Sequence, residues 1–520
     1  MSTRAPGCGR RATLAYAAAF AVSYLYAFPY FGALKSANEL PRIFMTQEIV
    51  ERRTFAIDAR LPEMGSTFDV ATASDGRHYP NKAPGLSLLA VPLYALAYAA
   101  APGVAGDLRA CTWLFRITLV TVPALLFLPV FLGVARRFAP ADDGRGAKAA
   151  LCAYGLGSML FPYALLFMSH APAAAAVGSA FAMAVALVRD GTRRPAYRAL
   201  AVGALSGLAV LCDYEAVLGA AIVAGYAIAG APRRRGTAVA ILAGAAPFAV
   251  VLLAFQWWCF GSPWKTGYSF SPHVAHHEGW LGLVGPNRFA FWIALLAPDN
   301  GLVVLSPWVL LAIVGVIAIF RSASARARVG HEAGVALAIA AGYVLLVGSM
   351  EPSITRGGWA VGPRYLAVAM PFFGWLAGAG LSTVGERPAG RVAGHTLVLV
   401  GVIIHALAAT TYPHWPDTLR NPVHEIAVRA LREGLAPHSL GTLCGLTGLP
   451  SLGPLYLAVA ALSFALLGGR PGRQWWPTVV AAALAAFIVF PGYGRFPRSG
   501  AEADGMWRFV RSTWEPVPRR

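Results

Sequence analysis

Long apolar segments recur along this 520-residue chain and constrain its fold more than any other feature. A run of about 20 apolar residues is the length that a helix needs to cross a bilayer. Only 13% of the residues are charged, whereas a soluble globular protein carries roughly 25%. The sequence therefore predicts an all-α polytopic membrane protein and excludes a soluble enzyme. A transmembrane β-barrel is excluded as well, because its strands would alternate apolar and polar residues.

The distribution of positive charge predicts how the helices are oriented. The chain has 43 basic and 24 acidic residues, a formal net charge of +19. Basic residues gather in the cytoplasmic loops of membrane proteins, so we do not interpret this excess as nucleic-acid binding. If the run 83–101 lies on the membrane surface, the predicted inner loops hold 21 basic and five acidic residues. If that run crosses, later loops change sides and the inner loops become much less positive. The first arrangement is preferred.

This arrangement predicts about 13 transmembrane helices, a cytoplasmic N-terminus and an outward C-terminus. The first helix follows Arg10 and Arg11, and we expect it to be an uncleaved span. The run 83–101 is expected to form a pair of juxtamembrane helices in a long first outer loop, 32–112. The other spans are expected near residues 113–135, 149–167, 171–188, 198–212, 215–230, 237–258, 301–320, 333–349, 365–384, 392–411, 454–468 and 475–491.

The loops predicted on the outer face carry the polar residues, whereas the inner loops are short and basic. They are expected at 35–82, 259–300, 350–364 and 412–453, with a tail from residue 492. No glycine-rich nucleotide-binding motif follows a strand, so we expect no nucleotide to be used on the inner side. The spans contain almost no acids and show no internal repeat, which counts against an ion-coupled transporter. Any chemistry is therefore expected outside.

The first outer loop offers two candidate groups. Asn38 suits the N-cap of an amphipathic helix, with Glu39 in its first turn. Glu39 is then either a helix-start carboxylate that complements the dipole or a base at the lipid–water boundary. Lys82 lies between two turn-forming stretches, where its ammonium either snorkels or meets a lipid phosphate at headgroup depth.

Later loops add arginines and histidines. Arg356 and Arg364 flank a Gly-Trp segment at the mouth of a span, and either they anchor the interface or their guanidinium forks bind phosphate. His273, His276, His277 and Glu278 do not have zinc spacing, and none of the six cysteines forms a CxxC pair. We interpret that stretch as a polar loop, and His170 as a satisfied interfacial histidine.

The order of these features resembles a known family. One helix precedes a long outer loop with an acidic juxtamembrane helix, a segment Tyr79-Pro80-Asn81-Lys82, many spans, and a late Arg364-Tyr365-Leu366 loop. This order is similar to that of the GT-C integral-membrane glycosyltransferases, most of all the lipid A aminoarabinose transferases and protein O-mannosyltransferases. The resemblance covers about residues 10–415. It implies a GT-C-like transmembrane catalytic module over 1–411, followed by a C-terminal region, 412–520, with an outer loop, two spans and the tail.

The resemblance also implies roles for single residues. The family places an Asp-Glu pair at the start of the first juxtamembrane helix, with the aspartate as catalytic base. Here the pair reads Asn38-Glu39, so the base is either Glu39 or another acid of the loop such as Asp69. Lys82 and Arg364, with Arg356 and Tyr365, are implied to bind the donor phosphate. Other candidate site residues are Asn38, Arg42, His78, Tyr79 and His170.

The resemblance further implies a glycosyltransferase that moves a monosaccharide from a polyprenyl-phosphate carrier to an acceptor by an inverting displacement. The acceptor would be a cell-envelope glycan, lipid or protein, and the site would face the periplasm from a bacterial inner membrane. Two alternatives stay open: a transporter or flippase of lipid-linked glycans, and an inactive GT-C relative acting as a scaffold. A requirement for a divalent metal also stays open, and no nucleic-acid partner is expected.

Overall fold

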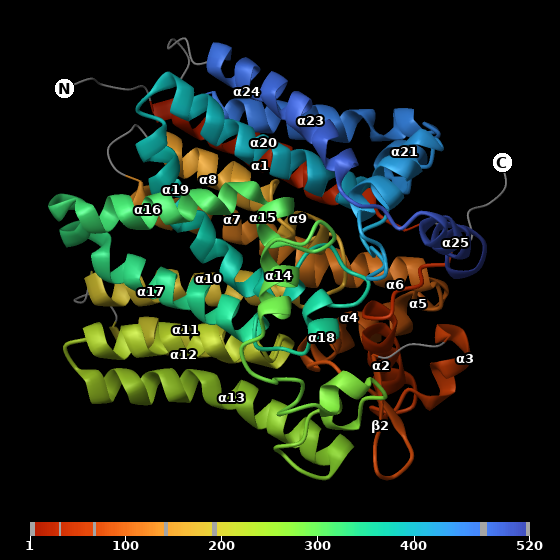
Figure 1. The fold of residues 1–520 in the computed structure, drawn as a ribbon. Helices are drawn as coiled ribbons and strands as arrows, with labels where there is room; N and C mark the ends of the chain where they lie inside the picture. Colours follow the sequence, from red (N-terminus) through yellow and green to blue (C-terminus); the bar gives the residue numbers. More distant parts are fainter. Residues whose placement is uncertain are drawn as a thin grey trace.

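The protein is almost entirely helical, as Figure 1 shows. The computed structural model describes residues 6–30, 33–65, 69–139, 144–189, 195–468 and 476–515. Parts of the predicted inner loops 1–11, 136–148, 189–198 and 469–473 lie outside the described residues.

The described helices confirm an all-α polytopic membrane protein, while the number of 13 spans stays a prediction. Nine helices are long and apolar enough to cross a membrane: Leu108–Phe138, His170–Arg189, Pro195–Cys212, Arg234–Phe260, Ala323–Val347, Arg364–Val384, Pro388–Thr410, Leu449–Leu467 and Trp476–Arg495. Shorter apolar helices in the same described ranges are Ala15–Leu25, Gly85–Ala100, Ala216–Gly230 and Pro307–Arg321.

The labels of Figure 1 follow the chain. The first half holds α1 (Pro6–Leu25), α2 (Glu39–Glu51), α3 (Leu61–Met64), α4 (Gly85–Ala100), α5 (Pro102–Ala105), α6 (Leu108–Arg116), α7 (Val122–Phe138), α8 (Arg145–Gly155), α9 (Leu160–Tyr163), α10 (His170–Arg189), α11 (Pro195–Cys212), α12 (Ala216–Gly230) and α13 (Arg234–Phe260). The second half holds α14 (Arg288–Leu295), α15 (Leu302–Leu305), α16 (Leu310–Arg321), α17 (Ala323–Val347), α18 (Pro352–Arg356), α19 (Met370–Val384), α20 (Pro388–Thr410), α21 (Arg429–Arg432), α22 (Leu440–Leu443), α23 (Gly453–Leu467), α24 (Trp476–Val489) and α25 (Ala501–Phe509).

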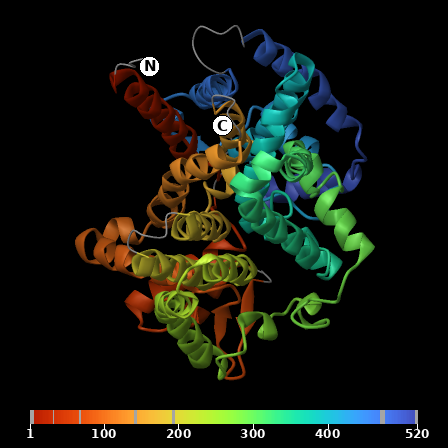
Figure 2. The same cartoon turned by 90° about the vertical axis from the view of Figure 1, so that its left-hand side faces the viewer.

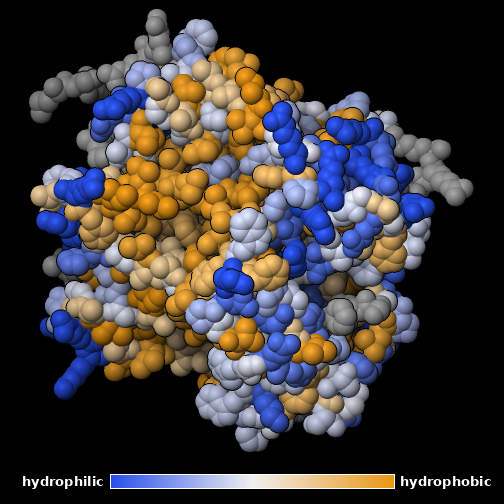
Figure 3. Space-filling view, viewed as in Figure 1, coloured by the Kyte–Doolittle hydropathy of each residue, from blue (hydrophilic) through white to orange (hydrophobic). Residues whose placement is uncertain are grey.

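The long helices lie side by side with their ends in two groups. Figure 2 looks along many of them, with α10 to α13 on one side of the molecule and the C-terminal helices on the other. In Figure 1 the turns after α12 and α16 lie at one end of the bundle, whereas α2, β2 (Val70–Thr72) and α25 lie at the opposite end. A broad apolar band covers the bundle, with hydrophilic residues at both ends (Figure 3). This pattern suits helices that span a bilayer.

Small residues allow neighbouring helices to approach closely. A Cβ atom on Gly203 of α11 would lie 1.9 Å from the carbonyl oxygen of Ile241 in α13. Conversely, a Cβ on Gly244 of α13 would lie 2.1 Å from the carbonyl oxygen of Leu200. Association of membrane helices depends on such close packing, because lipid tails are as apolar as the side chains. The pair α11 and α13 is therefore held together by reciprocal glycine contacts.

These contacts predict that Gly244→Ala destabilises the protein. The added methyl group would clash with backbone and force the two helices apart, and overpacking of this kind costs about 1–3 kcal/mol. The measurement is thermal unfolding in lipid nanodiscs. Gly225→Ala is the matched control, because nothing lies within 4 Å of a Cβ at that position in neighbouring α12. Equal unfolding midpoints for the two variants would contradict the packing.

The predicted span 149–167 is not one helix. α8 ends at Gly155, α9 covers only Leu160–Tyr163, and irregular backbone then runs to α10. Buried side chains bind the carbonyl groups freed by the break: Tyr24 Oη donates to Gly155 O at 2.5 Å, and Trp308 Nε1 donates to Gly157 O at 2.6 Å. Irregular backbone at membrane depth is tolerated where protein satisfies its polar groups.

The strands are few and short. β1 (Ala27–Phe28) pairs antiparallel with β4 (His438–Ser439), and β2 pairs antiparallel with β3 (His78–Pro80). β2 and β3 form a hairpin in the first outer loop, with Val70 opposite Pro80. The predicted surface run 83–101 follows this hairpin as the single helix α4, which packs against α2.

Candidate active site

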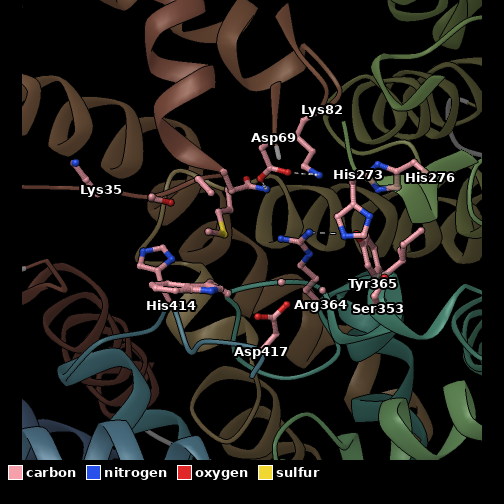
Figure 4. A pocket seen from close by; sticks show the side chains of 18 of the residues that line it. Lys35, Asp69, Lys82, His273, His276, Ser353, Arg364, Tyr365, His414 and Asp417 are labelled. Atoms are coloured by element: carbon pink, nitrogen blue, oxygen red, sulfur yellow. Dashed lines mark hydrogen bonds and ion pairs between the residues drawn. The ribbon is translucent and has the colours of Figure 1, made fainter. Parts of the chain in front are cut away.

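A cavity of about 350 Å³ lies at the end of the bundle where the predicted outer loops meet (Figure 4). Its lining comes from segments far apart in the sequence. They are residues 35–38, Asp69 and Lys82 of the first outer loop, Met168, His273, His276, residues 353–354, 357–359 and 364–365, His414, Asp417, Phe509 and Trp514. The four predicted outer loops and the tail therefore contribute to one cavity.

The hairpin β2–β3 brings a carboxylate and an ammonium group together. Asp69 precedes β2 and Lys82 follows β3, and the Asn81 amide donates to the carbonyl of Asp69 at 3.1 Å. Lys82 Nζ lies 2.9 Å from Asp69 Oδ1 and 4.9 Å from the ring centroid of Tyr268. Burial raises the pKa of Asp69, but the positive charges of Lys82 and Arg364 outweigh burial and lower that pKa below its ordinary value.

Arg364 contributes a second cation to the same cavity. Its side chain is 8% exposed, and its Nη2 donates to the Tyr365 hydroxyl at 3.2 Å. Among the described residues its Nε has no hydrogen-bond partner, and no carboxylate lies within ion-pair distance of it. A buried charge is costly unless an opposite charge compensates it. The cavity therefore favours an anion beside Arg364 and Lys82.

A second, smaller pocket of about 10 Å³ shares Asn38, Lys82, Arg364 and Tyr365 with the cavity. Its polar side chains form two chains of contacts that meet at Arg42. In the first, Arg42 Nε donates to Asn38 Oδ1 at 3.3 Å. In the second, Arg42 Nη2 donates to Ser169 Oγ at 3.4 Å, and Ser169 Oγ donates to Asp213 Oδ2 at 3.1 Å. The same Asp213 oxygen lies 3.0 Å from His170 Nδ1. Asn38 Nδ2 also donates to Asp69 Oδ2 at 3.4 Å. Of the predicted site residues, Asn38, Arg42 and His170 thus line this smaller pocket next to Lys82, together with Ser169 and Asp213, which were not predicted.

Glu39 belongs to the interior rather than to the lining of the cavity. It is 1% exposed, and its carboxylate accepts hydrogen bonds from the Tyr30 hydroxyl and, at 2.5 Å, from the Phe167 amide. Burial raises the pKa of Glu39 despite these donors. Its contacts are those of a group that joins α2 to the irregular segment before α10.

Three other predicted residues line neither the cavity nor the smaller pocket. Arg356 forms an ion pair with Asp299. His78 Nδ1 lies 2.7 Å from Asp58 Oδ1, and Tyr79 packs edge-on against Phe260. Within the described residues no group of three His, Cys, Asp or Glu side chains is arranged to hold a metal ion.

The cavity also contains residues that sequence reasoning did not assign to the site. They are Lys35, His414, Asp417, Trp359, Phe509 and Trp514, together with His273 and His276, which the sequence placed in a polar loop. His276 lies beside Tyr268 with ring centroids 4.7 Å apart. Burial, with Lys82 and His273 nearby, lowers the pKa of His276 to about 3, so its ring is neutral at physiological pH. Local sequence carries no signal for these positions, because they meet only through tertiary packing.

The contacts of Glu39 predict that Glu39→Ala destabilises the fold. The substitution would leave the Tyr30 hydroxyl and the Phe167 amide buried without their acceptor, at a cost of about 1–3 kcal/mol for each group. Thermal unfolding in nanodiscs measures the change, with Glu63→Ala, an exposed carboxylate of the same loop, as the control. Glu39→Gln should recover part of the loss, because its amide oxygen still accepts one bond. Equal midpoints for Glu39→Ala and Glu63→Ala would contradict a structural role.

Comparisons with known proteins give matches among solved structures only. No family model matches the chain, and no curated protein matches its sequence. The apo crystal structure of ArnT from Cupriavidus metallidurans matches with a TM-score of 0.47 and 14% identity, covering 98% of this chain and 89% of that one. A second crystal structure of that ArnT, bound to undecaprenyl phosphate, covers 94% and 79% at the same score and identity.

The archaeal oligosaccharyltransferase AglB from Archaeoglobus fulgidus, in complex with an inhibitory peptide and a dolichol-phosphate, matches with a TM-score of 0.40 and 14% identity. The match covers 98% of this chain and 60% of AglB.

Proposed function

We propose that this protein is a glycosyltransferase that moves a monosaccharide from a polyprenyl-phosphate carrier to a cell-envelope acceptor. The observation that carries the proposal is the pair of buried cations in the cavity. Lys82 has one carboxylate partner, Asp69, whereas Arg364 has none among the described residues. A phosphate group between them would supply the missing negative charge, and arginine's fork suits phosphate oxygens.

An apolar groove beside the polar site supports a lipid carrier. The groove has a volume of about 240 Å³ and lies among α4, α7, α10 and α11. Leu86, Leu126 and Phe127 are among its lining residues, and Cys212 borders both this groove and the smaller polar pocket. A polyprenyl chain in the groove would bring its phosphate to the polar end. In the proposed orientation, this end faces the periplasm of a bacterial inner membrane.

The proposed reaction is a single inverting displacement. An acceptor hydroxyl oxygen attacks the anomeric carbon of the donor sugar, and the bond from that carbon to the phosphate oxygen breaks. The electron pair leaves with the phosphate, where Lys82 and Arg364 stabilise the developing charge. The acceptor's proton passes to a carboxylate acting as general base. We assign this role to Asp69, because its carboxylate lines the cavity and that of Glu39 does not.

The ion pair between Asp69 and Lys82 links substrate binding to catalysis. In the structure, Lys82 holds the pKa of Asp69 down, which keeps the carboxylate ionised but makes it a weak base. A donor phosphate would also interact with the charge of Lys82, and Lys82 would then lower the pKa of Asp69 less. The base would thus become stronger when the donor is bound.

The proposal predicts that Lys82→Ala and Arg364→Ala lose donor binding and turnover. Each removes a charge-assisted contact worth about 1.5–3 kcal/mol, so we expect the affinity for undecaprenyl phosphate to fall by roughly tenfold to a hundredfold. The assay follows free polyprenyl phosphate released from a panel of polyprenyl-phosphate monosaccharides by purified protein in lipid. Lys265→Ala, an exposed lysine of an outer loop, is the control. Turnover that survives both cavity substitutions would overturn the proposal.

The two candidate bases predict different pH profiles. A carboxylate is ionised above its pKa, and that of Asp69 is lowered in the free protein, so kcat/KM should hold down to about pH 4 and fall only below it. Glu39 has a raised pKa, so a rate that depended on it would already fall above about pH 4.3. The donor is a phosphodiester and does not titrate in this range. Values of kcat/KM between pH 4 and 8, which report the free protein's groups, distinguish the two.

Substitutions complete this test. Asp69→Asn should remove turnover at every pH, whereas Asp75→Asn, an exposed carboxylate of the same hairpin, should retain the wild-type profile. If Asp69→Asn retains turnover and Glu39→Gln loses it without loss of folding, Glu39 is the base.

A further inference from the structure

One wall of the cavity is aromatic, and two of its three rings come from the C-terminal segment. Phe509 and Trp514 line the cavity together with Trp359 of the predicted outer loop 350–364. The ring centroids of Trp359 and Trp514 are 5.5 Å apart, and those of Phe509 and Trp514 are 6.2 Å apart. Trp359 is half-buried, and Phe509 is 40% exposed. We call these three residues the aromatic wall.

Buried hydrogen bonds fix the C-terminal segment in place. The Glu515 carboxylate is fully buried and accepts hydrogen bonds from the amides of Lys35 and, at 2.9 Å, Ala33. In α25, Trp507 Nε1 donates to Glu433 at 2.9 Å, and Asp504 forms an ion pair with Arg429 at 2.7 Å. The aromatic wall is thus a built part of the cavity, anchored to the first outer loop.

Polar groups lie beside the aromatic wall. Lys35 Nζ lies 5.6 Å from the ring centroid of Trp514. Asp417 also lines the cavity, and its carboxylate has no ion pair or hydrogen bond with the described residues. In Figure 4, Lys35 lies apart from Lys82 and Arg364, the two cations assigned to the donor phosphate, and Asp417 lies below Arg364 on the side away from Lys82. The cavity therefore offers aromatic faces, an ammonium and a carboxylate beyond what the donor phosphate uses.

We propose that the aromatic wall, with Asp417 and Lys35, binds the sugar ring of a carbohydrate acceptor. A sugar ring has an apolar face of C–H groups that stacks on an aromatic ring, and hydroxyls at its edge. A carboxylate accepts hydrogen bonds from two neighbouring hydroxyls, and an ammonium donates to a third. The proposal rests on the proposed function, because the bound acceptor hydroxyl would attack the donor sugar in the same cavity. It selects a glycan from the three acceptor classes that the sequence leaves open.

The test measures binding of sugars without any donor. Saturation-transfer difference NMR on the full-length protein in nanodiscs would use methyl glycosides of hexopyranoses and pentofuranoses as probes. A serine- and threonine-containing peptide and a glycan-free phospholipid headgroup serve as competing probes. We expect transfer to the C–H protons of at least one glycoside. Trp514→Ala and Asp417→Asn should weaken its binding by about tenfold, in the range of one lost aromatic or hydrogen-bond contact.

Control variants keep the result interpretable. Trp264→Ala replaces a tryptophan that is 80% exposed in another outer loop, and it should bind glycosides as the wild type does. Trp514→Phe retains an aromatic ring and should recover part of the binding that Trp514→Ala loses. Recovery by phenylalanine distinguishes stacking from a general loss of folding.

The outcomes separate the acceptor site from the proposed function. Glycoside binding that is unchanged in Trp514→Ala, or transfer to the peptide or headgroup alone, would overturn the acceptor site. If the protein releases polyprenyl phosphate from a donor but binds no glycoside, only the acceptor site fails. If it binds glycosides through Trp514 but cleaves no donor in the panel, the proposed function fails and the sugar-binding wall stands.

Discussion

The burial of charge at one end of the helix bundle is the constraint on which the candidate site depends. Lys82 and Arg364 are both at least 90% buried, and a buried cation must be compensated. The hairpin β2–β3 supplies Asp69 to Lys82, and a close approach of Gly267 to Asn81 brings Tyr268 over the same ammonium. No such carboxylate among the described residues is provided for Arg364. The fold thus fixes the positions of two cations while supplying one close anion.

A second constraint explains how the bundle reaches this cavity. Backbone amides and carbonyls must be satisfied in an apolar environment, and an unbroken helix does so most simply. The segment between α8 and α10 departs from a helix, and Tyr24, Trp308 and Glu39 compensate for the departure. As a result Met168 lines the cavity and Ser169 and His170 line the smaller pocket. The carboxylate of Glu39 thus stabilises the backbone next to these lining residues, although Glu39 itself does not line the cavity.

The sequence predicts much of this arrangement, and the limits have a physical origin. Apolar runs reveal the helices because membrane burial of a helix depends on local composition. The hairpin that brings Asp69 to Lys82 was not predicted, although its Asp75-Gly76 dipeptide is a known turn signal. The interior position of Glu39 depends on hydrogen bonds from the Tyr30 hydroxyl and the Phe167 amide. The sequence around Glu39 does not indicate these partners, because Phe167 comes close only in the folded chain. The same holds for Trp514, which reaches the cavity through contacts between the two ends of the sequence.

The two sides of the cavity suggest how one site can treat its two substrates differently. In the proposed function the donor would enter with a negative charge, and its recognition would rest on the buried cations Lys82 and Arg364. A carbohydrate acceptor is neutral, so its recognition has to rest on stacking and hydrogen bonds at the aromatic wall. Asp69 lies with the cations, so its strength as the proposed base would depend on whether Lys82 also binds a phosphate. Without a donor, a water molecule or an acceptor would face a carboxylate weakened by Lys82. The ion pair would then delay proton transfer until the donor is in place.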